Sequence, residues 1–337
     1  MVRLPIGKKD RPRVYVTRQL PGAGIDRLQR DCDVKIWDED LPPPRERLIE
    51  EARDAEALLC LLTDNIDAAL FESAPRLRVV STMAVGYDHI DVDAATRRGV
   101  LVTHTPGVLT ETTAEFAFAL MIAAARRLPE AERAVREGRW VAWQPSFLLG
   151  RDLHGATLGI VGLGAIGQAL ARRARAFDMR VLYYSRTAKP EIDRELGITY
   201  CPLDELLTQA DFVSVHLPLT PQTRHLFYDE AFARMKPTAI FINTARGAIV
   251  QETALLRALE TKRIAAAAID VTEVEPLPKT DPLLRLPNLL VTPHIASASV
   301  ATRMRMADLA VANLLDALAG RRPAHCVNPE VLDEQAK

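Results

Sequence analysis

Hydrophobic residues in the first third of the chain come in short runs that alternate with amphipathic segments. The runs have the aliphatic and β-branched composition of buried strands, and they lie at 14–17, 34–37, 57–62 and 77–83. An amphipathic segment such as 44–55 lies between two of them. Strands that alternate with helical patterns indicate a parallel sheet covered by helices. We therefore expect a flavodoxin-like α/β unit here.

A second alternation of the same kind starts at Thr157 and predicts a second doubly wound parallel sheet. Its strand-like runs include 157–161, 180–184, 211–217, 238–244, 264–271 and 288–293. Between the two alternations, one long helix is expected from Thr110 to about Glu137, because this stretch is rich in good helix formers. The amphipathic segment 297–319 predicts a last helix that returns to the first unit.

Composition excludes several classes of protein. The 337 residues are 48% hydrophobic and 26% charged, which is an ordinary globular balance and leaves room for two domains. With 43 basic and 44 acidic side chains, no overall field would attract nucleic acid or an anionic membrane. The four cysteines are scattered singly, so neither a disulfide framework nor a metal centre is expected. A cytoplasmic protein with a small-molecule partner is the simplest interpretation.

A glycine-rich turn carries the strongest single motif. Gly162, Gly164 and Gly167 follow a strand-like run and open a helix, which is the context that a dinucleotide-binding fingerprint needs. The helix N-terminus would offer free N–H groups to a pyrophosphate. The intervening residues of the turn are Leu163, Ala165 and Ile166. The alternative is a turn that packs without a ligand.

The next strand ends without the acid that usually binds the ribose of NAD. Ser185 stands where that carboxylate is expected, and Arg186 and Thr187 follow it. Hydroxyl and guanidinium groups can bind a 2′-phosphate, whereas an acid would repel it. This favours NADPH over NADH, unless Arg186 is merely a solvated surface residue.

Three further strand ends carry polar residues suited to hydride transfer onto a 2-oxo acid. A cation must bind the carboxylate and polarise the carbonyl, and an acid must protonate the new alkoxide. Arg246 and His294 suit these two roles, and Glu275 would orient His294 and favour its protonated ring. His216 also ends a strand, but it ranks second as an acid. Each residue taken alone has a structural alternative.

The combined pattern resembles the D-2-hydroxyacid dehydrogenase family, and within it the NADPH-dependent glyoxylate/hydroxypyruvate reductases. The resemblance covers nearly the whole chain. It rests on the segments AVGYDHIDVDAATRRG, TPGVLTETTAEFAFAL, TLGIVGLGAIGQALA, YYSRT, HLPLT, MKPTAIFINTARGAIV, AAIDVTEVEP and TPHIASAS. It implies a substrate domain at 1–104 and 296–337 and an NADP-binding Rossmann domain at 105–295.

The resemblance also implies roles for individual residues. Arg246, Glu275 and His294 form the catalytic set, and the turn of Val85 and Gly86 donates N–H groups to the substrate carboxylate. Trp143 either reaches a partner subunit's pocket or packs in the core of a dimer. Besides the glycine turn and Ser185 to Thr187, the cofactor-binding residues are Thr113, Pro218, Thr244, Ala245 and Asp270.

Two residues depart from the family pattern. His104 replaces the usual Asn before TPG, and Ala296 replaces the usual Gly after HI. We expect a homodimer, from the helix beginning near Thr110 and from Trp140 and Trp143. A larger 2-oxo acid such as 2-ketogluconate is the alternative substrate. A corepressor-like protein that senses a dinucleotide is the alternative from another class.

Overall fold

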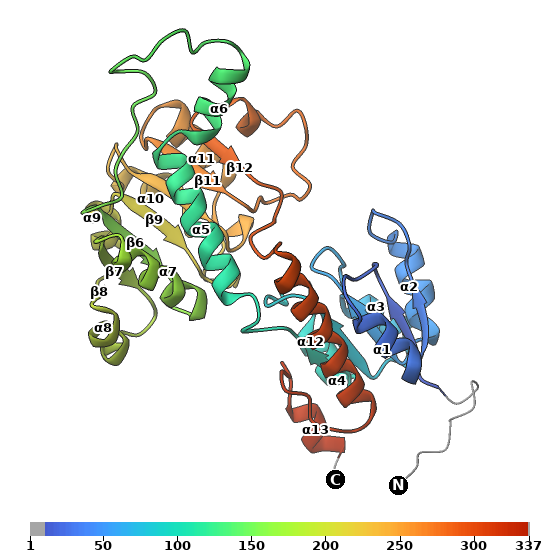
Figure 1. The fold of residues 1–337 in the computed structure, drawn as a ribbon. Coiled ribbons are helices and arrows are strands. Elements are labelled where there is room, and N and C mark those ends of the chain that lie inside the picture. The colour runs from blue at the N-terminus through green and yellow to red at the C-terminus, as the bar shows by residue number, and fades with distance from the viewer. Residues whose placement is uncertain (1–10, 336–337) are drawn as a thin grey trace. The chain divides into compact units, whose positions relative to one another are not determined.

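The computed structural model describes residues 11–335, and the chain divides into two compact units. Unit 1 comprises residues 1–109 and 298–337, of which 11–109 and 298–335 are described, and unit 2 comprises residues 110–297. Each unit is built on one parallel sheet with helices packed against it (Figure 1). The predicted class of two parallel-sheet α/β units is confirmed.

Unit 1 has a five-stranded sheet in the order β2-β1-β3-β4-β5, with all pairings parallel. This is the flavodoxin-like order. The central strands are buried along their full length because helices cover both faces, so their sequences read as continuous apolar runs. The strands are β1 (Arg13–Val16), β2 (Asp33–Ile36), β3 (Ala57–Cys60), β4 (Val79–Thr82) and β5 (Leu101–Thr103).

The helices of unit 1 include one from the C-terminal part of the chain. Helix α12 (Val300–Leu318) packs on β3, β4 and β5, and the buried Ser81 Oγ donates to the Ala310 carbonyl at 2.9 Å. The side chain of Ser299 caps its N-terminus. The last predicted helix therefore lies against the first sheet. The other helices are α1 (Gly24–Asp31), α2 (Arg45–Asp54), α3 (Ala68–Ser73), α4 (Val92–Arg97) and α13 (Glu330–Gln335).

Unit 2 has a seven-stranded parallel sheet in the order β12-β11-β10-β9-β6-β7-β8. The chain builds one half outward from β6 and then returns to build the other half from β9, so the strand order reverses between β6 and β9. Ligands of doubly wound sheets bind at such a reversal, outside the carboxyl ends of the strands. The strands are β6 (Thr157–Val161), β7 (Arg180–Tyr184), β8 (Thr199–Tyr200), β9 (Phe212–Val215), β10 (Ile240–Asn243), β11 (Ala266–Ile269) and β12 (Leu289–Val291).

The single helix predicted from Thr110 to about Glu137 is wrong in one respect, because the structure divides it. Helix α5 (Thr110–Ala125) packs on α7, β10 and β11, and α6 (Leu128–Arg136) follows after a break. Arg127 has φ of 53°, and Pro129 cannot donate to the preceding turn. The remaining helices are α7 (Ala165–Ala176), α8 (Pro190–Leu196), α9 (Leu203–Gln209), α10 (Asp229–Arg234), α11 (Glu252–Glu260) and the short 3₁₀ helices η2 (Gly247–Ile249) and η3 (Pro282–Arg285).

Candidate active site

The glycine turn of unit 2 joins β6 to α7 and has the packing that a dinucleotide site requires. Gly162 has φ of 107°, and a Cβ there would lie 2.6 Å from the His216 carbonyl oxygen at the carboxyl end of β9. A Cβ on Gly167 would overlap the Gly162 carbonyl oxygen. These two glycines let the turn approach β9 and let α7 pack against the turn. Any other residue at either position would displace backbone.

Two features of this region point outward, to a ligand. Gly164 is exposed, and a Cβ built on it has nothing within 4 Å. Thr244, just after β10, is buried, and its Oγ1 has no hydrogen-bond partner among the described residues. A buried hydroxyl is normally paired. The open turn, the N-terminus of α7 and the orphaned hydroxyl together fit a bound dinucleotide.

The end of β7 carries the polar residues predicted for a 2′-phosphate, and the structure adds a cation. Ser185 Oγ donates to the Thr187 carbonyl at 2.6 Å, which closes the turn, and Arg186 is exposed. Lys189 Nζ donates to the Leu163 carbonyl of the glycine turn at 2.8 Å. Sequence reasoning missed Lys189 because it lies beyond the expected strand end. The only signal was its position shortly after the Ser-Arg-Thr sequence.

The three predicted catalytic residues follow three adjacent parallel strands. Arg246 follows β10, Glu275 follows β11 and His294 follows β12, and these strands pair in register. Their carboxyl ends share one edge of the sheet, so the topology gathers the three residues at that edge. A Cβ on Gly247 would lie 2.5 Å from Glu273 N, which shows that the Arg246 turn lies directly against the loop of Glu275.

His294 and Glu275 form a close pair. His294 Nδ1 lies 2.7 Å from Glu275 Oε2, and both side chains are partly exposed, at 23% and 29%. Because a carboxylate only accepts hydrogen bonds, Nδ1 carries the proton in this contact. Nε2 is then the atom left to exchange a proton with a substrate. The other Glu275 oxygen, Oε1, accepts from Thr272 N at 3.1 Å, which holds the carboxylate in place.

The backbone around Arg246 is held by a residue that sequence reasoning did not single out. The buried Asn243 Nδ2 donates to the Arg246 carbonyl at 2.9 Å, and its Oδ1 accepts from Ala245 N at 3.0 Å. This amide closes the turn that follows β10. Arg246 Nη1 donates to the Ala245 carbonyl at 2.9 Å. The signal for Asn243 in the sequence is a polar residue at the end of an otherwise apolar strand.

Asp270 contacts the His294 loop with both of its carboxylate oxygens. Oδ1 accepts from Thr292 Oγ1 at 2.6 Å and from Ile295 N at 2.9 Å, and Oδ2 accepts from Ala296 N at 2.7 Å. His294 N also donates to the Asp270 carbonyl at 2.9 Å, and His294 has φ of 54°. Asp270 is 1% exposed. These contacts hold the unusual backbone conformation of His294.

His216 lies at the carboxyl end of β9, with its Nε2 2.8 Å from Ser214 Oγ. Burial lowers the pKa of its ring from 6.5 to about 4, so the ring is neutral near pH 7. A neutral, hydrogen-bonded ring beside the glycine turn suits a wall of the site better than a proton donor.

The remaining predicted residues lie in both units. Thr113 is buried in the first turn of α5, and the Pro218 carbonyl accepts from Thr223 Oγ1 at 2.7 Å. Trp143 is 82% exposed on the segment after α6. Val85 and Gly86 lie in unit 1, in the loop that follows β4. Among the described residues, no group of histidine, cysteine and acidic side chains could hold a metal ion.

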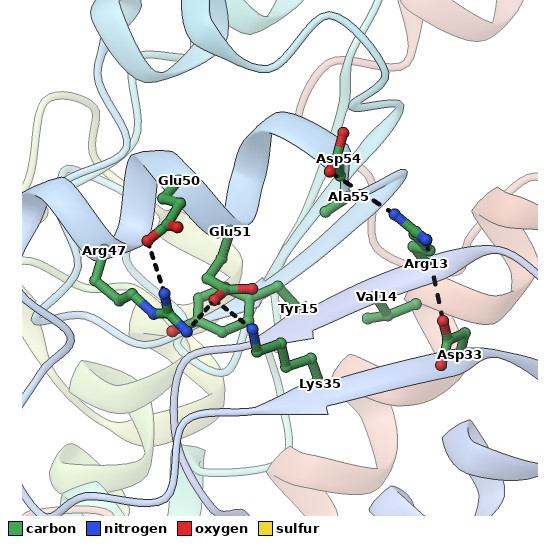
Figure 2. Close-up of a pocket in the computed structure, with 10 residues that line it drawn as sticks. All are labelled: Arg13, Val14, Tyr15, Asp33, Lys35, Arg47, Glu50, Glu51, Asp54 and Ala55. Atoms are coloured by element: carbon green, nitrogen blue, oxygen red, sulfur yellow. Dashed lines mark hydrogen bonds and ion pairs between the residues drawn. The ribbon is translucent and has the colours of Figure 1, made fainter.

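Unit 1 also carries a charged groove, which is shown in Figure 2. Its charged side chains form ion pairs with one another: Lys35 Nζ and Arg47 Nη2 each lie 2.6 Å from Glu51 Oε1, and Arg47 Nη1 lies 2.7 Å from Glu50 Oε2. Tyr15 also lines the groove, and burial raises the pKa of its hydroxyl to about 12. Because acids outnumber cations here, the groove does not suit an anionic substrate.

The comparisons with known proteins agree with this geometry. The family model described as D-isomer specific 2-hydroxyacid dehydrogenase, NAD binding domain, matches residues 118–296, which is just over half of the chain. A glyoxylate reductase of Korarchaeum cryptofilum is 52% identical over 323 residues, which cover 96% of this chain and 97% of that protein. The chain belongs to the D-isomer specific 2-hydroxyacid dehydrogenase family. The family resemblance predicted from the motifs is thus confirmed.

Solved structures extend the agreement to the whole fold of this dehydrogenase. The TT0316 protein of Thermus thermophilus has a TM-score of 0.88 and 49% identity, with 94% of this chain and 99% of that chain covered. An NADPH-dependent glyoxylate/hydroxypyruvate reductase of Sinorhizobium meliloti, solved with NADP and malonate, has a TM-score of 0.83 and 35% identity. That comparison covers 94% of this chain and 97% of the other. The NAD-binding domain of this dehydrogenase lies within unit 2.

Proposed function

We propose that this dehydrogenase reduces glyoxylate and hydroxypyruvate to the corresponding D-2-hydroxy acids, with NADPH as the reductant. The observation that carries the proposal is the His294–Glu275 pair, on the same sheet edge as the Arg246 turn and the dinucleotide turn. Two relatives named glyoxylate reductase are 52% and 51% identical over 96% of this chain, and they support the choice of small 2-oxo acids as substrates.

The three strand-end residues divide the work of the reduction. The bound nicotinamide dinucleotide would supply the hydride that adds to the carbonyl carbon of the 2-oxo acid. The Arg246 guanidinium would bind the substrate and polarise its carbonyl oxygen. His294 would donate the proton from Nε2 to that oxygen, which completes the hydroxyl group. Glu275 would accept from Nδ1–H throughout and stabilise the charged ring.

The preference for NADPH rests on what stands at the end of β7. Ser185, Arg186 and Thr187 offer hydroxyl and guanidinium groups, and none of these repels a 2′-phosphate. The ammonium of Lys189, against the glycine turn, adds a second positive charge to this region. The relative from Sinorhizobium meliloti that was solved with NADP is described as NADPH-dependent.

We also propose that the enzyme is a homodimer formed through the region after α5. Six large apolar side chains of α6 and the segment that follows it are exposed: Leu128, Val135, Trp140, Val141, Trp143 and Leu149. Such an accumulation is unusual on a monomer and is typical of an interface. Sedimentation at micromolar concentration should therefore give a dimer, and a monomer would contradict this assignment.

One set of assays tests the proposed reaction. Oxidation of NADPH and of NADH should be followed with glyoxylate and hydroxypyruvate, and with pyruvate and 2-ketogluconate for comparison. The two small substrates with NADPH should give the highest kcat/KM. His294→Asn should lower kcat by about 10²- to 10⁴-fold with NADPH binding retained, because proton donation is lost and the glycine turn is unchanged. If 2-ketogluconate is reduced faster than glyoxylate, the larger 2-oxo acid is the substrate and the proposed substrate is wrong. If His294→Asn turns over at a rate comparable to the wild type, His294 is not the acid.

A further inference from the structure

We propose that His104 positions the Val85–Gly86 turn, so that the turn's N–H groups are directed at the substrate carboxylate. The inference rests on the proposed function and on the family resemblance, which implies that this turn binds the carboxylate of the 2-oxo acid. It gives a role to a residue that departs from the family pattern, since Asn usually precedes the TPG sequence. All of the contacts that carry it lie within unit 1.

The decisive contact joins the His104 ring to the turn. His104 Nδ1 lies 2.8 Å from the Val85 carbonyl oxygen. Because a carbonyl only accepts hydrogen bonds, Nδ1 carries a proton and donates it to Val85. Burial lowers the pKa of the His104 ring below its usual 6.5, so the ring is neutral near pH 7. The hydrogen bond to the Val85 carbonyl then sets the tautomer.

Fixing the Val85 carbonyl also fixes the N–H of Gly86. The two groups belong to one planar trans peptide, in which the C=O and the N–H point in opposite directions. A donor that holds the carbonyl on one side therefore directs the Gly86 N–H to the other side. Among the described residues, neither the Val85 nor the Gly86 N–H has a backbone acceptor, so both are available to a ligand.

His104 is itself firmly held, as a positioning residue must be. Its carbonyl accepts from Asn313 Nδ2 of α12 at 2.9 Å, and its N–H donates to the His325 carbonyl at 3.3 Å. The next residue provides a second link to the loop, because Thr105 N donates to the Ala84 carbonyl at 2.8 Å. The loop after β4 is thus attached to the segment after β5 at two successive residues.

The contact explains how His can replace Asn at this position. The amide nitrogen of Asn and Nδ1 of His are the same number of bonds from the backbone. Asn can therefore donate to Val85 as His does, whereas the amide of Gln extends one bond further, toward the position of Nε2. His104→Asn and His104→Gln are therefore a matched pair of variants, because both carry the same amide donor and differ only in the length of the side chain. His104→Leu removes the donor.

The experiment measures KM and kcat for glyoxylate, the affinity for the carboxylate inhibitor oxamate by calorimetry with NADPH present, and the affinity for NADPH alone. We expect His104→Asn to stay within about twofold of the wild type. His104→Gln and His104→Leu should raise KM and weaken oxamate by about three- to tenfold, the effect of one neutral hydrogen bond. NADPH affinity should not change, since its predicted residues lie in unit 2.

The outcomes separate this inference from the proposed function. Equal KM values and oxamate affinities in all three variants would overturn the role of His104, as would equal losses in Asn and Gln. A parallel loss of NADPH affinity would indicate a general structural role instead and would equally overturn it. If the wild type reduces neither small 2-oxo acid, the proposed function fails. In that case the order of oxamate affinities among the variants still decides whether His104 positions a carboxylate site. If His104→Leu does not fold, the comparison of His104→Asn with His104→Gln decides it.

Discussion

Replacing Gly247 with Ala should damage the active site through backbone displacement alone. A Cβ at this position would lie 2.5 Å from Glu273 N and would overlap the Thr272 carbonyl group. An ordinary contact begins at 3.4 Å, and the Thr272 carbonyl atoms are nearer to this Cβ than Glu273 N, so the two loops must separate by more than about 1 Å. The opposing atoms are backbone, so no side-chain rotation can relieve the overlap. One loop carries Arg246, and the other carries Glu275.

The expected cost follows from that displacement. Thr272 N donates to Glu275 Oε1 at 3.1 Å, so moving this peptide also moves the carboxylate that orients His294. A misplacement of about 1 Å can cost about 10²-fold in rate, and we expect that loss in kcat/KM for glyoxylate. Overpacking costs about 1–3 kcal/mol, which should lower the melting temperature by a few degrees.

A matched substitution controls for the general effect of replacing glycine. Gly24 lies at the start of α1 in unit 1, where the nearest atom to an added Cβ is the flexible Asp308 Oδ1 at 3.3 Å. Gly24→Ala should leave kcat/KM within about twofold. If Gly247→Ala keeps wild-type activity and melting temperature, the overlap is relieved without cost, and the close approach of the two loops does not position the catalytic residues.

Three further predictions concern charge and protonation. Arg246→Lys should lower both substrate affinity and kcat, because a point charge does not replace a planar fork that binds two oxygens; unchanged steady-state parameters would make this Arg structural. The depressed pKa of His216, about 4 against 6.5, means that only the unfolded state takes up its proton as pH falls below 6.5. The destabilisation of the folded state by His216 is absent above that pH and reaches roughly 2 kcal/mol by pH 5. Between pH 7.5 and pH 5, the melting temperature of His216→Gln should therefore fall less than that of the wild type. Ser185→Asp and Arg186→Ala should each reduce the NADPH to NADH ratio of kcat/KM, by about one to two orders of magnitude if a charge-assisted contact is lost, and an unchanged ratio in both would leave this turn without a role in cofactor choice.

The architecture could be predicted from the sequence because the hydrophobic pattern within each strand and helix shows which of its faces is buried. Two alternations of apolar runs and amphipathic segments indicated two parallel sheets, and both are present. The division of the helix after Thr110 was missed, although Pro129 was visible. The composition on both sides of the break favours a helix, and the left-handed Arg127 between α5 and α6 has no strong sequence signal.

The proposed catalytic side chains follow a more visible sequence pattern than the residues that hold them. Arg246, Glu275 and His294 each follow a strand-like run, and parallel strands bring such ends to one edge. The partners of Asp270 lie 22 to 26 residues further along the chain, so no local pattern reveals that its carboxylate holds the His294 loop. Lys189 lies beyond the expected end of its strand, and only folding places its ammonium against the Leu163 carbonyl.

The glycines of unit 2 separate the requirements of folding from those of a ligand. At Gly162, Gly167 and Gly247, an added Cβ would meet backbone atoms, so packing alone accounts for glycine at these positions. At Gly164 the same Cβ would meet nothing within 4 Å, and the backbone there has an ordinary negative φ of −76°. The folded chain by itself therefore gives no reason for glycine at 164. A phosphate group that approaches the first turn of α7 does, because a side chain would occupy the space that the phosphate needs. Gly164, the glycine of this turn that packing does not explain, is therefore the strongest indication in the turn of a bound ligand.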